Sequence, residues 1–190
     1  MKKIYLGADQ LLNDSFILAE KILTSKFIPD LVVGIWRGGS PVAIAIVEVF
    51  GYAGIEVEHL PLKAASYSGI AQRSGVKLTG LDMITDSLDK HGKLLLVDDV
   101  FDTGNSIQTI MDALTQHYGQ HMPQIRVAVP WFKPDNNQTS IKPDYFLHET
   151  TDWLVFPHEL AGLGTDDLLS SKPLQKGVLE RIIKSSKTTS

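Results

Sequence analysis

Two short, uninterrupted apolar runs constrain the fold of this chain most strongly. They are LVVGIW at residues 31–36 and KLLLV at residues 93–97, and each ends in a loop that is polar or rich in glycine. Apolar runs of this length, bounded by loop signals, are typical of buried strands. Because helical patterns alternate with them along the chain, we expect an α/β fold with a mainly parallel central sheet flanked by helices.

The hydrophobic pattern also predicts the other elements. Helices are expected over residues 8–26, 41–50, 104–118 and 172–184, and further strands over residues 55–60, 124–130, 145–150 and 153–156. The apolar face of the first helix is predicted from four positions at helical spacing, Leu12, Phe16, Ala19 and Leu23. Residues 63–82 are rich in Ser, Gly and Ala, and we expect a long mobile excursion there with weak strand character.

The composition excludes several classes of function. The net charge is −4, whereas a nucleic-acid surface is usually strongly basic, so no nucleic-acid partner is expected. The chain has no cysteine, which excludes disulfides, thiolate metal sites and cysteine nucleophiles. The N-terminus MKKIYLGADQ lacks the apolar segment of a signal peptide, and no apolar run approaches the ~20 residues of a membrane span. We therefore expect a cytoplasmic protein without an integral membrane segment.

The segment LLLVDDVFDTGNS, residues 94–106, carries the strongest functional signal. In it a buried strand runs into Asp98 and Asp99, a third carboxylate follows at Asp102, and a helix begins after Thr103. In open α/β sheets, ligands bind just beyond the carboxyl ends of the strands. The free N–H groups of a helix N-terminus suit a phosphate, and small residues let the backbone approach it closely.

These three carboxylates have no lysine or arginine among them, so they repel one another. A cluster of this kind usually meets a metal ion or hydroxyl donors. We expect Asp98 and Asp99 to bind ribose hydroxyls and to help hold Mg²⁺, and Asp102 to exchange a proton with a base. The phosphate cradle is expected at Thr103, Gly104, Asn105 and Ser106. An ordinary strand end followed by a capped helix would explain two adjacent aspartates, but not the whole spaced string.

The segment resembles the phosphoribosyl pyrophosphate signature of type I phosphoribosyltransferases, which is an apolar strand, two acids, and then D-T-G with a small or hydroxyl residue. The resemblance extends over about residues 1–160 and is closest to bacterial and archaeal xanthine–guanine and hypoxanthine–guanine phosphoribosyltransferases. It implies the type I phosphoribosyltransferase fold with a small C-terminal base-binding hood. We therefore expect a phosphoribosyltransferase domain over residues 1–160, including the base-binding segment, and a partly flexible C-terminal extension over residues 161–190.

Two further segments resemble parts of the family that contact pyrophosphate. Arg37, Gly38 and Gly39 follow a strand, and a guanidinium with two glycines can wrap a pyrophosphate, as the family's pyrophosphate loop does. Ser66 and Tyr67 resemble the start of the family's mobile lid, which excludes water from an oxocarbenium-like transition state. Each segment alone would be interpreted more simply, as a glycine-rich turn and as a flexible surface loop.

Two more segments resemble the family's base site. Lys133 matches the base-binding lysine, whose ammonium would donate to an oxygen at position 6 of a purine and disfavour an amino group there. Trp153 matches the tryptophan that stacks on the flat base, and backbone groups near Leu154 and Val155 would contact the other purine edge. Glu159 matches an acidic position that meets a second Mg²⁺. A surface lysine and a core tryptophan are the simpler interpretations of these residues taken singly.

The two histidines near these segments are not expected to bind a metal. His148 and His158 lack a partner at metal-ligand spacing, which predicts structural or surface roles. The family often has tryptophan where this chain has His158, so the local packing at that position is open.

The resemblance implies one reaction. The 5-phosphoribosyl group passes from phosphoribosyl pyrophosphate to N9 of a 6-oxopurine (guanine, xanthine or hypoxanthine) in purine salvage, with Mg²⁺, in a cytoplasmic homodimer or homotetramer. Two alternatives stay open at this point. One is a non-catalytic regulator of the same fold that senses phosphoribosyl pyrophosphate, and the other is a transferase for another base, such as orotate or adenine. The presence of Ser66, Tyr67, Lys133 and Trp153 favours the purine enzyme.

Overall fold

The computed structural model of the protein describes residues 2–67, 75–88, 92–171 and 176–186. Its contacts divide the chain into two compact units, one of Asp9–Thr151 and one of Met1–Ala8 together with Asp152–Ser190. The boundary that we expect near residue 160 stays a prediction.

The larger unit is built on a five-stranded sheet with the strand order β4-β3-β2-β5-β7. The strands are β2 (Leu31–Trp36), β3 (Glu58–Tyr67), β4 (Gly75–Thr79), β5 (Lys93–Val97) and β7 (Gln124–Ala128). β2 is parallel to β3 and β5, and β5 is parallel to β7, whereas β4 runs antiparallel to β3. The α/β fold with a mainly parallel central sheet is thus confirmed.

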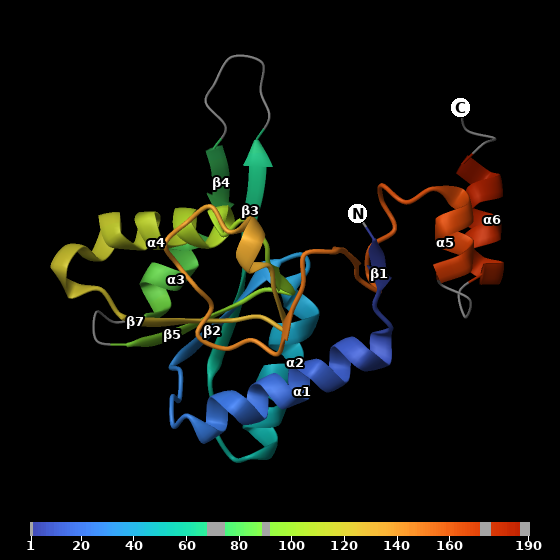
Figure 1. Cartoon of the computed structure of the whole chain (residues 1–190). Coiled ribbons are helices and arrows are strands. Elements are labelled where there is room, and N and C mark those ends of the chain that lie inside the picture. Colours follow the sequence, from blue (N-terminus) through green and yellow to red (C-terminus); the bar gives the residue numbers. More distant parts are fainter. Residues whose placement is uncertain (1, 68–74, 89–91, 172–175, 187–190) are drawn as a thin grey trace. The chain divides into compact units, whose positions relative to one another are not determined.

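Helices cover both faces of this sheet (Figure 1). The helices α1 (Ala8–Thr24) and α2 (Gly39–Tyr52) lie on one face, and α3 (Leu81–Ser87) and α4 (Asn105–Tyr118) lie on the other. Leu31, Val33 and Ile35 of β2 pack in one core cluster with residues of α3 and α4, which include Ile84, Ile107, Ile110 and Leu114. Because successive side chains of a strand point to opposite faces, a strand covered on both sides is apolar on both, as β2 is and as β5 is after Lys93.

The predicted apolar face of the first helix is confirmed at Ala19 but is wrong at two of its four positions. Leu12 and Phe16 are 49% and 45% exposed, and the helix buries a different stripe, formed by Leu11, Asp14, Ser15, Leu18, Ala19 and Ile22. Two polar residues are buried there because each has a hydrogen-bond partner. The Ser15 hydroxyl donates to the carbonyl of Leu11 at 2.7 Å, and the Asp14 carboxylate lies 3.1 Å from Nε2 of His148. A hydrophobic pattern does not reveal such positions, because it counts polar residues as exposed.

The weak strand character expected within residues 63–82 is in fact an antiparallel hairpin. β3 continues to Tyr67, and its partner β4 returns from Gly75, with the ladder running from Lys63–Thr79 to Tyr67–Gly75. Backbone pairing needs no large side chains, which is why a segment of Ser, Gly and Ala forms strands here. Gly80 adopts φ +95° between β4 and α3. Residues 68–74 of the expected excursion lie outside the described residues.

A second, three-stranded sheet lies in the same unit, with the order β6-β8-β9. Its strands are parallel and short: β6 (Val100–Phe101), β8 (Trp131–Phe132) and β9 (His148–Glu149). β8 is followed by a 3₁₀ turn over Pro134–Asn136. This small sheet matters for function because it joins the segment after β5 to the segment that carries Lys133.

The smaller unit contains a parallel pair of strands and two helices. β1 (Lys3–Tyr5) pairs with β10 (Trp153–Val155), and α5 (Thr165–Ser171) and α6 (Lys176–Ser186) lie side by side (Figure 1). The predictions of strand 153–156 and of a terminal helix are confirmed with shifted ends, whereas β1 and α5 were not predicted. No helix in the described part of the chain is both long and apolar enough to cross a membrane.

Candidate active site

The acidic segment begins where β5 ends. The N–H of Asp98 donates to the carbonyl of Ala128 at 3.2 Å, which continues the pairing with β7 beyond the strand. The N–H of Asp99 then donates to Oδ1 of Asp98 at 2.9 Å. The two adjacent aspartates are therefore held in fixed positions at the carboxyl edge of the sheet.

Electrostatics set these two carboxylates apart from ordinary surface acids. Asp99 is only 8% exposed. Burial of the Asp98 carboxyl raises its pKa well above the usual value, and the charge of Asp99 raises that pKa further. Two adjacent acids at a buried strand end repel one another, and a cation or hydroxyl donors at this edge would offset that repulsion.

The glycine-rich loop after β2 packs directly against these acids. The Trp36–Arg37 peptide bond is cis. A Cβ added at Gly38 would lie 2.1 Å from Oδ2 of Asp99. A Cβ at Gly39 would lie 2.3 Å from the carbonyl oxygen of Val97. Only glycine fits at these two positions of the loop. The glycine loop and the acidic segment, which are 60 residues apart in the sequence, are therefore in contact.

A small polar cavity lies beyond β5, with a volume of about 90 Å³. It is lined by Asp98, Val100, Phe101, Asp102, Thr103, Gly104, Asn105, Ser106 and Ile107. Gly104 has φ +79° and turns the chain into α4, where a non-glycine residue would be strained. The hydroxyl of Thr103 accepts a hydrogen bond from the N–H of Asn105 at 3.4 Å. The residues predicted to form the phosphate cradle thus line a concavity at a helix N-terminus, and its role as an anion site stays a prediction.

Asp102 lies at the rim of this cavity with both carboxylate oxygens engaged. Nζ of Lys133 lies 3.1 Å from Oδ2, and Nδ2 of Asn136 donates to Oδ1 at 2.8 Å. The Asp102 side chain is 40% exposed, whereas that of Lys133 is 6% exposed. A lysine and an aspartate that sequence reasoning assigned to different functions thus form an ion pair.

Backbone hydrogen bonds explain why Lys133 reaches Asp102. The N–H of Lys133 donates to the carbonyl of Phe101 at 2.9 Å, and the N–H of Gln138 donates to the carbonyl of Thr103 at 3.0 Å. The loop over residues 133–139 is therefore tied at both ends to the loop that carries Asp102. Sequence reasoning missed Asn136, since an asparagine in a loop after Lys-Pro shows no periodicity and belongs to no quoted motif.

The remaining predicted site residues lie in, or soon after, the strands β3 and β10. Ser66 and Tyr67 lie in the last two positions of β3, where they pair with Val76 and Gly75. The predicted site residues of the smaller unit lie in and just after β10. Trp153 is 55% exposed, and the N–H of Phe156 donates to Oε2 of Glu159 at 3.0 Å.

The remaining backbone positions and histidines have structural surroundings. Leu154 and Val155 are buried and pair with Ile4 and Tyr5. The ring of His158 stacks on Phe156 with centroids 5.6 Å apart, and His148 lies against both Trp131 and Asp14. Among the described residues, no group of three or more His, Cys, Asp or Glu side chains could hold a metal ion. A metal ion at this edge would therefore need oxygen atoms of a bound substrate in addition to the two adjacent carboxylates.

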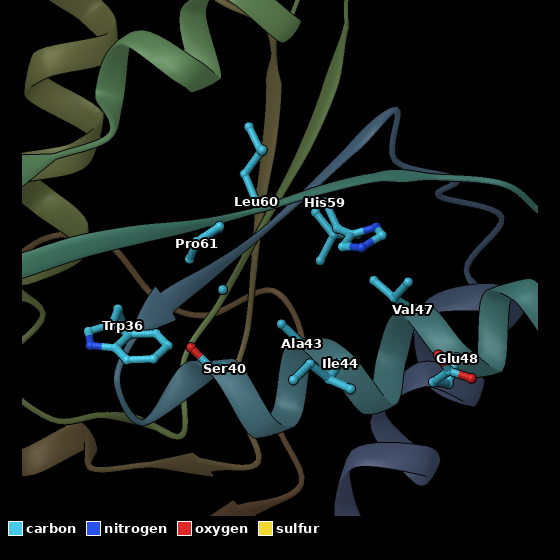
Figure 2. Close-up of a pocket in the computed structure, with 11 residues that line it drawn as sticks. Trp36, Ser40, Ala43, Ile44, Val47, Glu48, His59, Leu60 and Pro61 are labelled. Carbon is cyan, nitrogen blue, oxygen red and sulfur yellow. The ribbon is translucent and has the colours of Figure 1, made fainter.

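A larger cavity, of about 310 Å³, lies between β2, α2 and β3 (Figure 2). Its walls are mostly apolar, with Ile44 and Val47 of α2 opposite Leu60 and Pro61 of β3. Of the predicted site residues, none lines it. The candidate site is therefore the polar cavity at the end of β5 and not this apolar one.

The comparisons with known proteins agree with this geometry. The family model of the phosphoribosyl transferase domain matches residues 7–161, so the chain belongs to that family. The family that the sequence motifs predict is thereby confirmed. No curated protein sequence matches the chain.

Solved structures give more particular likenesses. A purine phosphoribosyltransferase from Pyrococcus horikoshii is 26% identical, covers 86% of this chain and 98% of its own, and superposes with a TM-score of 0.65. The xanthine–guanine–hypoxanthine phosphoribosyltransferase of Helicobacter pylori is 21% identical, with coverages of 82% and 92% and a TM-score of 0.64. A Neisseria gonorrhoeae protein solved with bound ppGpp is 20% identical, with coverages of 93% and 97% and a TM-score of 0.66. The last two likenesses show the fold alone.

Proposed function

We propose that this protein transfers the 5-phosphoribosyl group from phosphoribosyl pyrophosphate to N9 of guanine, xanthine or hypoxanthine. One observation carries the proposal: the nearly buried Lys133 ammonium lies 3.1 Å from the Asp102 carboxylate, at the rim of the cavity before α4. A donor for a 6-oxo group and a carboxylate for a base proton therefore lie together beside a phosphate-sized concavity.

The phosphoribosyl pyrophosphate would bind along the edge formed by the two loops. Its 5′-phosphate would occupy the cavity at Thr103–Ser106, and its ribose hydroxyls would meet Asp98 and Asp99. Its pyrophosphate would lie against Arg37, Gly38 and Gly39, with the Ser66–Tyr67 lid closing over it. The close contact of Gly38 with Asp99 supports one continuous site for the ribose and the pyrophosphate.

The family resemblance assigns contacts with the base to Lys133, which follows β8, and to Trp153 of β10. Lys133 would donate to the oxygen at position 6, and Trp153 would stack on the purine ring. Backbone groups near Leu154 and Val155 would contact the opposite edge. The 26% identity to the Pyrococcus horikoshii purine phosphoribosyltransferase supports a purine as the accepting base.

Magnesium suits the donor set at the acidic edge. Asp98 and Asp99 would hold it together with substrate oxygens, and Glu159 would meet a second ion, because Mg²⁺ is usually bound by one or two carboxylates and substrate phosphates. The adjacency of Asp98 to the nearly buried Asp99, whose N–H donates to Oδ1 of Asp98 at 2.9 Å, supports a cation here. When bound, Mg²⁺ would neutralise charge on the pyrophosphate leaving group.

The chemical step would proceed without a covalent enzyme intermediate. A bond forms between N9 and the anomeric carbon while the bond from that carbon to the pyrophosphate oxygen breaks, and pyrophosphate leaves with the electron pair. The purine gives up one proton, which Asp102 accepts near N7. Arg37 and the backbone donors of its loop stabilise the charge of the departing pyrophosphate. The products are a nucleoside 5′-monophosphate and pyrophosphate, as in purine salvage, and we propose a cytoplasmic homodimer or homotetramer as the working form.

Pyrophosphate release tests the proposal. The protein is incubated with phosphoribosyl pyrophosphate and Mg²⁺, and with guanine, xanthine, hypoxanthine or adenine in parallel. We expect release with at least one 6-oxopurine and none above background with adenine. Binding of phosphoribosyl pyrophosphate without release for any of these bases would instead support the regulator, and release with adenine alone would support a transferase for another base.

A further inference from the structure

The Asp102 carboxylate has two partners that differ in kind. Lys133 is charged, nearly buried and 3.1 Å from Oδ2, whereas Asn136 is neutral and donates to Oδ1 at 2.8 Å. Both come from the loop over residues 133–139, but at different places in it. If both partners stayed bound, neither oxygen of the Asp102 carboxylate would be readily available to accept a proton from the base.

The two partners are not equally free to leave. The N–H of Asn136 donates to the carbonyl of Lys133 at 3.1 Å, so its short side chain is held by the 3₁₀ turn Pro134–Asn136. Lys133 has four side-chain methylenes between its backbone and its ammonium, and its backbone is held by hydrogen bonds of its own, with its N–H donating to the carbonyl of Phe101 at 2.9 Å. An ammonium can therefore move to a new acceptor without any change in the loop, whereas the amide of Asn136 cannot.

We propose that Asn136 is the positioning residue for Asp102, and that Lys133 masks the other carboxylate oxygen until a 6-oxo group accepts its ammonium. This inference rests on the proposed function. Asn136 keeps Oδ1 and with it the orientation of the carboxylate. Arrival of a 6-oxopurine draws Lys133 from Oδ2, which becomes available to the proton at N7. Recognition of the base and release of the catalytic carboxylate are then one event.

The proposal also gives a reason for specificity. A 6-amino group offers donors, so it does not attract Lys133, and Asp102 stays paired. Adenine would therefore be rejected twice, by a donor facing a donor and by a carboxylate that is not released. A lysine that only contacted the base would provide the first of these two effects alone.

Substitutions at residue 136 separate a hydrogen-bond donor from a space-filling side chain. Asn136→Ala removes the donor, and Asn136→Asp keeps the shape but places an acceptor against Oδ1. If the amide orients Asp102, kcat falls about tenfold or more in Asn136→Ala, as expected for a lost hydrogen bond to a charged group, and falls further in Asn136→Asp. The KM for phosphoribosyl pyrophosphate stays within about twofold of wild type, since the phosphate loop is unchanged.

Asn137→Ala is the matched control in the same loop. The Asn137 side chain donates to the carbonyl of Ile141 at 2.8 Å and accepts from the N–H of Thr139 at 2.9 Å, so it stabilises the loop without touching Asp102. We expect kcat within about twofold of wild type for this variant, as for a substitution outside the reacting groups. The Asn136→Ala change is also made in the Asp102→Ala background, where it should leave kcat unaltered because the residue acts only through Asp102.

The outcomes separate this inference from the proposed function. Both the inference and the proposed function are supported if the wild-type protein turns over and kcat falls in the order Asn137→Ala, Asn136→Ala, Asn136→Asp. Two results overturn the positioning role while the proposed function stands. One is a wild-type protein that turns over with Asn136→Asp at the same kcat. The other is a loss of kcat on Asn136→Ala that is equally large in the Asp102→Ala background. Absence of wild-type turnover with every purine overturns the proposed function, and the inference falls with it.

Discussion

At the scale of single residues, Asp102 combines exposure with restraint. Its side chain is 40% exposed, so a base can reach it, yet both of its oxygens have hydrogen-bond partners. An unrestrained surface carboxylate would sample several rotamers, and each would place its oxygens differently. The partners therefore define where a proton could be accepted.

Asp102→Asn should separate catalysis from binding. The amide has nearly the same size, so the phosphate loop is kept, but it cannot accept the proton. We expect kcat to fall by about 10²-fold or more, the usual contribution of a general base, with little change in the affinity for phosphoribosyl pyrophosphate. Steady-state kinetics and calorimetric titration measure the two quantities, and an unchanged kcat would remove Asp102 from the reaction.

Lys133→Ala should erode the preference among bases. Without the ammonium, a 6-oxo group loses its donor and a 6-amino group loses its repulsion. We expect the ratio of kcat/KM for hypoxanthine over adenine to fall about tenfold or more, by the loss of one hydrogen bond from a charged donor. The ratio is measured with both bases under the same conditions, and an unaltered ratio would place Lys133 outside the base site.

Asp98 predicts a pH dependence of stability. Burial, and then the charge of Asp99, raise its pKa in the folded protein above the usual value of 3.8. Between those two pKa values the folded state keeps a proton that the unfolded state has lost. The free energy of unfolding should therefore fall as pH rises from about 3.8 through the raised pKa, and level off above it.

Urea denaturation at a series of pH values measures this effect, with Asp98→Asn beside wild type. We expect the variant to lack the decline, and to be more stable than wild type at neutral pH. The exposed Asp86 of α3 is the control, since Asp86→Asn should keep the wild-type pH dependence. If the free energy of unfolding declines with pH in Asp98→Asn as it does in wild type, groups other than Asp98 cause the decline.

At the scale of elements, the start of α2 shows how a helix and a strand can build a binding edge together. Gly39 begins the helix, and a Cβ there would lie 2.3 Å from the carbonyl oxygen of Val97 and 2.7 Å from Cα of Asp98. Both are backbone atoms of a central strand end, so they have little freedom to move. The helix can approach the acidic segment this closely only with glycine at its first position.

Gly39→Ala should consequently destabilise the protein. Either α2 or the end of β5 must shift, and overpacking of this kind costs about 1–3 kcal/mol. Gly51→Ala, in the last turn of the same helix, is the control, because no atom lies within 4 Å of its added Cβ. We expect that control to gain about 0.5–1 kcal/mol from the helix preference of alanine. Chemical denaturation compares the two, and equal stabilities would contradict the close packing.

Elements with strong patterns could be predicted from the sequence. β2 and β5 are uninterrupted apolar runs, and α4 has a regular apolar face that includes Ile107, Ile110 and Leu114, all of which are buried. The hairpin of β3 and β4 was recognised only as weak strand character, because few of its residues beyond Lys63 are large and apolar, although Leu62 and Leu78 join the core. The buried face of α1 was predicted only in part, because a carboxylate and a hydroxyl are buried in it.

The candidate site was predictable to a similar degree. The acidic segment and the glycine loop lie at strand ends, where α/β sheets bind ligands, and the structure brings them into contact. The pairing of Asp102 with Lys133 and Asn136 depends on a loop path across the small sheet of β6, β8 and β9. No local pattern specifies such a path, since it follows from hydrogen bonds between segments about 30 residues apart.

At the scale of the whole molecule, a chain with a net charge of −4 has a fold that binds anionic substrates. The proposed site would account for this, because a helix N-terminus, Arg37 and backbone N–H groups follow strand ends at one edge of the sheet. Membership of the phosphoribosyl transferase domain family defines the reaction class to test. The base that accepts the phosphoribosyl group is the central claim of the proposal.

A competition for limiting phosphoribosyl pyrophosphate tests that claim most directly. Guanine, xanthine, hypoxanthine and adenine are supplied together in equal amounts with Mg²⁺, and the nucleotides formed are identified by mass. The account predicts nucleoside 5′-monophosphates of one or more 6-oxopurines and none of adenine. Adenosine 5′-monophosphate as the main product, or no nucleotide from any base, would contradict it.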